Sequence, residues 1–114
     1  MTVPFIPTKD FERTIKFYQA LGFQADPIQP GDSRTCYVQY EDNALILQEY
    51  YVKDWAENTM LTIHVSNLDD FIRNLEDVLK TYEDAKYNGP KDFGWGIQIH
   101  LLDPTGVLLH VFQK

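Results

Sequence analysis

The strongest constraint on the fold is a helical pattern that occurs twice in the 114 residues. Each copy opens on a residue suited to a helix N-cap, Asp10 or Asn67, whose side chain can accept hydrogen bonds from the free amides of the first turn. Apolar residues then follow at helical spacing. They are Phe11, Ile15, Tyr18 and Leu21 in the first copy and Leu68, Phe71, Ile72, Leu75, Val78, Leu79 and Tyr82 in the second. The chain therefore divides into two similar halves, 1–57 and 58–114.

Extended segments complete each half. Strands are predicted over 2–8, 24–28, 34–41 and 44–51 in the first half, and over 59–66, 85–87, 96–102 and 107–112 in the second. Asp42 and Asn43 tolerate positive φ and predict a hairpin turn, and Asp103-Pro104-Thr105-Gly106 predicts another. The order is β-α-β-β-β twice, an α+β fold. Two copies are too few for a solenoid, so both modules should form one domain, 1–114.

Composition narrows the classes of partner and compartment. The net charge of −7, from 10 Lys and Arg against 17 Asp and Glu, argues against binding to duplex nucleic acid. No run approaches the roughly 20 apolar residues of a bilayer helix, and Pro4 and Pro7 interrupt what would be the apolar core of a signal peptide. Cys36, the one cysteine, predicts a small buried strand residue in a cytoplasmic protein without an intramolecular disulfide.

Strand alternation separates the two faces of each predicted sheet. One face is aliphatic and belongs under the helix, with Leu45, Leu47, Leu61, Ile63, Val65, Ile97, Ile99, Leu101, Leu109 and Val111. The opposite face carries Tyr37, Gln39, Ile46, Gln48, Tyr50, Met60, Thr62, His64, Gln98, His100, Leu108, His110 and Phe112. This mixture of aromatic, apolar and uncharged polar side chains is typical of a concave binding site and equally of a subunit interface.

The two tryptophans, Trp55 and Trp95, fall in segments predicted to be loops. In Phe93-Gly94-Trp95-Gly96 the glycines flank a stacking surface, which predicts a mobile loop that closes over a ligand. The alternative is that Trp95 is a hydrophobic plug at the end of the last hairpin. The residues expected to bind a ligand are Tyr37, Gln39, Gln48, Tyr50, Trp55, Met60, Thr62, Phe93, Trp95, Gln98, His110 and Phe112.

The repeats and the last turn give the segments PFIPTKDFERTIKFYQALGF, LTIHVSNLDDFIRNLEDVL and LLDPTGVLLHVF. Together they resemble the glyoxalase / bleomycin-resistance / extradiol-dioxygenase superfamily, also called vicinal oxygen chelate, over essentially the whole chain. The resemblance implies two βαβββ modules that form a curved mixed sheet around a cavity. It also implies a homodimer, in which a module of one chain completes the cavity with a module of the other. Function stays open, because such proteins include metal-dependent lyases and dioxygenases, thiol transferases and metal-free drug-sequestering proteins.

The resemblance places the family's metal ligands at Val3, Met60 and His110. Valine cannot coordinate, methionine is a poor ligand for hard or borderline divalent ions, and one imidazole does not make a site. The sequence is therefore most similar to the bleomycin-resistance branch, with which the Val3-Pro4 opening also agrees. This implies a binding protein for a small molecule, without cofactor and without turnover. A cationic, aromatic ligand would stack on Trp or Tyr and be attracted by the acidic chain.

An enzyme is the main alternative, acting as a lyase, isomerase or dioxygenase. His64, His100 and His110 could form a three-histidine metal site, or serve with Glu49 in acid–base chemistry. No HExxH, phosphate loop or Ser/His/Asp grouping supports this alternative. A third hypothesis is an accessory module whose mixed face is wholly an interface. The acidic residues expected to lie outside any cavity are Asp69, Asp70, Glu76 and Asp77.

Overall fold

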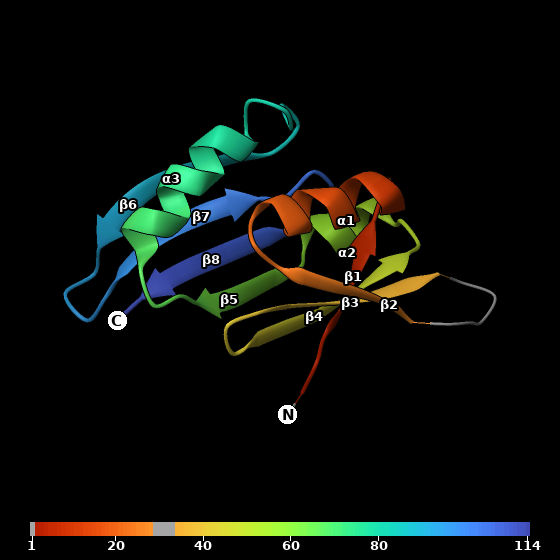
Figure 1. The fold of residues 1–114 in the computed structure, drawn as a ribbon, viewed down its shortest axis with the longest axis horizontal. Helices are drawn as coiled ribbons and strands as arrows, with labels where there is room; N and C mark the ends of the chain where they lie inside the picture. The colour runs from red at the N-terminus through yellow and green to blue at the C-terminus, as the bar shows by residue number, and fades with distance from the viewer. Residues whose placement is uncertain (1, 29–33) are drawn as a thin grey trace.

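The computed structural model describes residues 2–28 and 34–114, and its elements follow the predicted order (Figure 1). The first half contains β1 (Phe5–Thr8), α1 (Phe11–Ala20), β2 (Gln24–Ile28), β3 (Thr35–Tyr40) and β4 (Asn43–Glu49). The second half contains β5 (Met60–His64), α3 (Leu68–Val78), β6 (Lys86–Asp92), β7 (Ile97–Leu102) and β8 (Leu108–Gln113). A short helix, α2 (Lys53–Glu57), connects the halves.

The two long helices begin with the same cap, as the repeat predicts. The Asp10 carboxylate accepts a hydrogen bond from the amide of Arg13 at 3.1 Å. The Asn67 side-chain oxygen accepts one from the amide of Asp70 at 3.0 Å. In each case one of the free amides of the first turn is satisfied, which fixes where the helix starts. Helix α3 ends at Val78, so Tyr82, the last residue of the apolar stripe predicted for this helix, lies beyond it.

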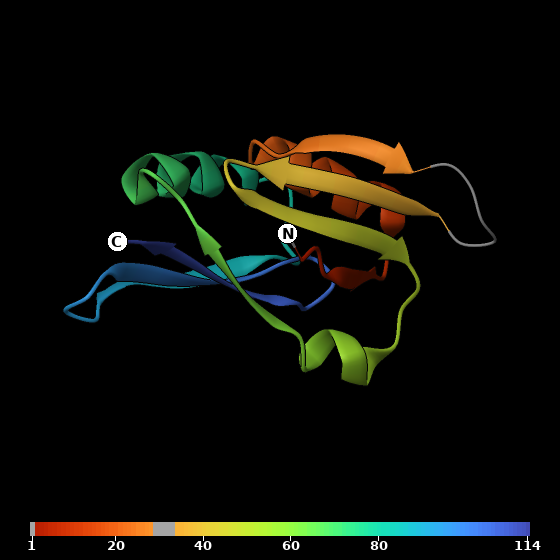
Figure 2. The same cartoon turned by 90° about the horizontal axis from the view of Figure 1, so that it is seen from below.

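Each half forms its own four-stranded mixed sheet. The strand orders are β1-β4-β3-β2 and β5-β8-β7-β6, and in both sheets the first pair is parallel and the other pairs are antiparallel. The same topology therefore occurs twice, which confirms an α+β fold of two βαβββ modules. Because each helix covers one face of a sheet, the other face is left open (Figure 2).

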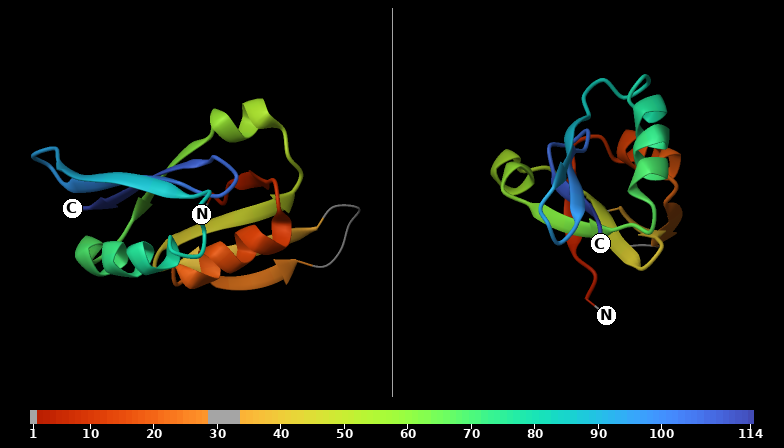
Figure 3. Two further views of the ribbon diagram at one scale, coloured as in Figure 1. Left: turned by 90° about the horizontal axis from the view of Figure 1, so that it is seen from above. Right: turned by 90° about the vertical axis from the view of Figure 1, so that its left-hand side faces the viewer.

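The two modules share one hydrophobic core. Helices α1 and α3 lie in a row, and the Asn74 side chain of α3 donates a hydrogen bond to the Ala20 carbonyl at 2.9 Å (Figure 3). The Tyr18 hydroxyl of α1 donates to the Asp103 carboxylate, between β7 and β8, at 2.8 Å. The Asn43 side chain at the start of β4 donates from Nδ2 to the His64 carbonyl at 2.7 Å, and its Oδ1 accepts from the backbone amide of His64 at 3.1 Å.

Three local predictions differ from the structure. Strand β6 continues to Asp92, well beyond the predicted 85–87, because Gly89 and Pro90 obscure a strand at the edge of the sheet, where proline is tolerated. Trp55 lies in α2 and not in a loop, since five residues are too few to show a helical period. In the β3–β4 turn the positive φ of 51° belongs to Glu41, while Asn43 already pairs in β4.

Cys36 is buried in β3 and is a free thiol, as the sequence predicts. Within the described ranges, no helix is both long enough and apolar enough to cross a bilayer.

Candidate functional site

The open face of the second sheet carries three rows of side chains across its strands. Residues paired directly on neighbouring strands point to the same face, so the register defines each row. The rows are Met60–Leu108–Leu102–Lys86, Thr62–His110–His100–Asn88 and His64–Phe112–Gln98–Lys91. The aliphatic residues between them, such as Ile63, Ile99 and Val111, are buried on the other face. The predicted assignment of faces in this sheet is therefore correct.

The open face of the first sheet carries the predicted tyrosine and glutamines. Tyr37 pairs with Ile46, Gln39 with Ala44, and Gln48 with Thr35. Tyr50 follows β4 directly, and its ring centroid lies 6.0 Å from that of Trp55 in α2. These two rings form an aromatic pair at the end of β4, apart from the rows of the second sheet.

Two of the three histidines meet on the second sheet. The ring centroids of His100 and His110 are 4.6 Å apart. The Gln98 side-chain nitrogen lies 2.9 Å from His100 Nε2 and 2.8 Å from His110 Nδ1. The remaining nitrogen, His110 Nε2, is buried and has no hydrogen-bond partner among residues 2–28 and 34–114. Burial, with His100 nearby, lowers the pKa of His110, which favours the neutral ring near pH 7.

His64 lies apart from this pair. It occupies the row of Phe112, and their ring centroids are 5.0 Å apart. Among residues 2–28 and 34–114, no three His, Cys, Asp or Glu side chains are grouped so that they could hold a metal ion. Val3, Met60 and His110, at which the resemblance places metal ligands, are a donor set that does not suit a divalent ion.

The Phe93-Gly94-Trp95-Gly96 segment is the turn between β6 and β7. The Phe93 amide donates a hydrogen bond to the Gly96 carbonyl at 2.9 Å, which closes the hairpin. Trp95 is 64% exposed, and its ring centroid lies 5.8 Å from that of Phe93 and 5.0 Å from that of Phe112. Phe93, Trp95, Phe112 and His64 thus form a continuous aromatic group at one end of the open face.

A hollow of about 460 Å³ adjoins the histidine pair. It is lined by Lys86, Tyr87, Asn88, His100, Leu102 and Leu108. None of these six is among the ligand-binding residues expected from the sequence, in which His100 is a catalytic or metal candidate and Leu108 only a residue of the open face. Alternation in β7 already places Leu102 with His100, but no signal in the sequence extends β6 far enough to bring Asn88 opposite His100.

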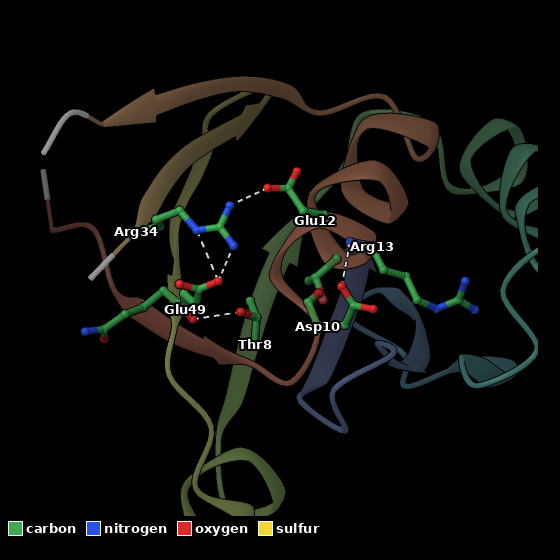
Figure 4. A network of polar contacts seen from close by, with 8 residues as sticks. Thr8, Asp10, Glu12, Arg13, Arg34 and Glu49 are labelled. Carbon is green, nitrogen blue, oxygen red and sulfur yellow. Dashed lines mark hydrogen bonds and ion pairs between the residues drawn. The ribbon is translucent and has the colours of Figure 1, made fainter. Parts of the chain in front are cut away.

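Glu49, a candidate acid–base residue, belongs to a different part of the molecule. It follows Leu45 and Leu47 on the helix side of β4, and Arg34 donates hydrogen bonds both to it and to Glu12 of α1 (Figure 4). The hydrogen bond from Arg34 lowers the pKa of the Glu49 carboxyl. Glu49 is therefore part of an ion-pair network on the helix side and not of the open face.

Comparison with known proteins gives structural relatives only. Neither a protein-family model nor a curated protein matches the sequence. A bleomycin resistance determinant encoded on transposon Tn5 matches with a TM-score of 0.79 at 24% identity, over 100% of this chain and 97% of that chain. This chain has the bleomycin-resistance fold.

Two further structures support the assignment of the bleomycin-resistance fold. A bleomycin-binding protein complexed with bleomycin has a TM-score of 0.79 at 22% identity, over 100% of this chain and 98% of that chain. TnmS3, an antibiotic binding protein from Streptomyces sp. CB03234, has a TM-score of 0.79 at 24% identity, over 100% of this chain and 96% of that chain. At these identities the similarity establishes the fold and leaves the ligand open.

Proposed function

We propose that this protein binds a small molecule of the antibiotic type on its open sheet faces, without metal and without chemical change. The observation that carries the proposal is the aromatic group of Phe93, Trp95, Phe112 and His64 at one end of the open face whose other end lines the 460 Å³ hollow. Apolar walls with a few oriented polar groups are what small-molecule sites use. Proteins of the same fold include a bleomycin-binding protein and an antibiotic binding protein.

The chemistry of three side chains supports binding without turnover. The resemblance aligns Val3 and Met60 with the metal-ligand positions of the superfamily's enzymes, and neither side chain suits a hard or borderline cation. Glu49 lies with Arg34 on the helix side of β4, so it supplies no general base to the open face. The free thiol of Cys36 agrees with a cytoplasmic location, where thiols stay reduced.

Bleomycin is the first probe, and tryptophan fluorescence reports on its binding. We expect saturable quenching in the wild type, because Trp95 is exposed and offers a stacking surface. Trp95→Leu should weaken binding about fivefold, since one aromatic contact contributes about 1 kcal/mol. Trp55→Leu, measured in parallel, separates the contribution of α2. If neither bleomycin nor another antibiotic changes the fluorescence or is retained in equilibrium dialysis, the proposal is wrong.

We further propose that the open faces are covered by a second copy of the chain, so that each site forms between two modules. Large apolar side chains remain exposed on the described chain, notably Phe5, Tyr50 and Met60, the last with 64% of its surface accessible. Exposed apolar area of this kind is typical of interfaces.

Light scattering tests the dimer. We expect a particle of twice the 13.3 kDa chain mass at micromolar concentration. Met60→Glu should shift the mass toward the monomer, because it buries a charge in the interface. Gln19→Glu adds the same charge on the exposed surface of α1 and should leave the mass unchanged. A wild-type monomer would rule out the dimer.

A further inference from the structure

The open face of the second sheet differs in charge from the chain as a whole. The chain carries −7, yet the charged residues in the three rows are Lys86 and Lys91, and these rows contain no Asp or Glu. The exposed acidic side chains Asp69, Asp70, Glu76 and Asp77 project from α3, on the covered side of the sheet. The other acidic residues of this module, which also lie outside the three rows, are Glu83, Asp84, Asp92 and Asp103. A ligand on the open face therefore meets local positive charge and hydrogen-bonding rings, not carboxylates.

Gln98 orients the two neighbouring histidines. Its side-chain nitrogen carries two hydrogens and lies within 3 Å of one nitrogen of each ring, so it can donate to both. A neutral imidazole that accepts at one nitrogen carries its proton on the other. With the Gln98 nitrogen as the donor to both rings, His100 carries its proton on Nδ1 and His110 carries its proton on Nε2.

These tautomers leave donors without acceptors at the hollow. His100 lines the hollow, and its Nδ1 has no hydrogen-bond partner among the described residues. The proton on His110 Nε2 is buried and unpartnered as well. Lys86 and Asn88 line the same hollow, and Lys86 forms no ion pair within the part of the chain that the structure describes. Leu102 and Leu108 supply an apolar wall.

We infer that this hollow binds the carboxylate of a small aromatic acid, with His100 Nδ1–H, Lys86 and Asn88 as donors. The apolar wall takes the body of the ligand, and the carboxylate supplies the acceptor that the oriented rings lack. The inference rests on the proposed small-molecule binding and deepens it by naming the charge of the ligand. That charge is opposite to the one expected from the net charge of the chain.

The tautomers can be measured without any ligand. Long-range ¹H–¹⁵N spectra at about pH 8, where ordinary imidazoles are neutral, distinguish a proton on Nδ1 from one on Nε2. We expect His100 to be protonated at Nδ1 and His110 at Nε2 in the wild type. Gln98→Met, which has a similar shape but no donor, should convert both rings to tautomer mixtures. Protonated Nε2 in His100 or protonated Nδ1 in His110 would overturn the inference.

Ligand charge is tested with two flat probes of the same size, benzoate and benzamidinium. Millimolar benzoate should shift the His100 ring signals saturably, whereas benzamidinium should not. Lys86→Met should weaken benzoate binding about fivefold, as expected for one exposed ion pair, while Lys80→Met, two residues after α3, should not change it. Equal binding of both probes at His100 would overturn the inference. Bleomycin binding without a benzoate response would overturn the carboxylate inference and leave the proposed function intact. Benzoate binding without antibiotic binding would overturn the proposed function and leave the carboxylate inference intact.

Discussion

Gly96→Ala is expected to destabilise the protein by about 3 kcal/mol, the upper end of what an overpacked core usually costs. A Cβ at this position would lie 1.9 Å from Phe112 Cε2 and 2.9 Å from the backbone oxygen of Gln113. The Phe112 ring is only 5% exposed and is held between Trp95 and His64, so it has little room to move. The substitution should also displace the aromatic group and weaken ligand binding.

Gly94→Ala is the matched control, because it adds the same methyl group in the same turn. No atom in the described part of the chain lies within 4 Å of a Cβ at Gly94, whose φ is +85°. We therefore expect only backbone strain of about 1 kcal/mol. Urea denaturation of both variants compares their free energies of unfolding.

In a Phe112→Leu background, which lacks the clashing ring atoms, Gly96→Ala should lower the free energy of unfolding much less. If Gly96→Ala costs no more than Gly94→Ala, the ring is not held as described.

The features that could be predicted from the sequence are those with a strong local period. Asp10 and Asn67 cap their helices as expected, because an N-cap depends on contacts only three residues away. The alternation through β5, β7 and β8 places His64, His100 and His110 on the open face correctly, since aliphatic residues fill every other position. The burial of one face fixes such a register.

The remaining features depend on contacts between distant segments. Asn88 joins the site only because edge strand β6 extends past Gly89 and Pro90, which have low strand propensity. Glu49 is held on the helix side by Arg34 and Glu12, and no spacing in the sequence predicts that network. The net charge of the chain does not predict the charge of the ligand, because it is a sum over all residues. The charge that a ligand meets depends on which face each side chain occupies.

Asp103 is the second position where we expect a large effect, here on the dependence of stability on pH. Its carboxylate is 1% exposed, accepts a hydrogen bond from the Tyr18 hydroxyl at 2.8 Å, and accepts others from the amides of Thr105, Gly106 and Val107. Burial raises the pKa of Asp103 to about 6, although these hydrogen bonds oppose the shift. The charged form is thus the costly one in the folded state.

A pKa that is higher in the folded chain than the ordinary 3.8 means that the folded state binds the proton more tightly. The stabilisation from Asp103 is therefore complete below pH 3.8 and is lost as the pH rises through about 6, a loss of about 3 kcal/mol. Asp103→Asn resembles the protonated form and keeps an oxygen for the three amides. The unfolding free energy of the wild type minus that of Asp103→Asn should fall by this amount between those pH values.

Asp84→Asn tests the sign of this effect. Arg13 donates a hydrogen bond to Asp84 and lowers the pKa of that carboxyl, so the stabilisation from Asp84 is present above its ordinary pKa and is lost in acid. The unfolding free energy of the wild type minus that of Asp84→Asn should therefore rise with pH, while the corresponding difference for Asp103→Asn falls. Urea denaturation across this pH range measures both. A flat or rising difference for Asp103→Asn would mean that its carboxylate is ionised in the folded protein at no cost, through the donors from Tyr18 and the turn.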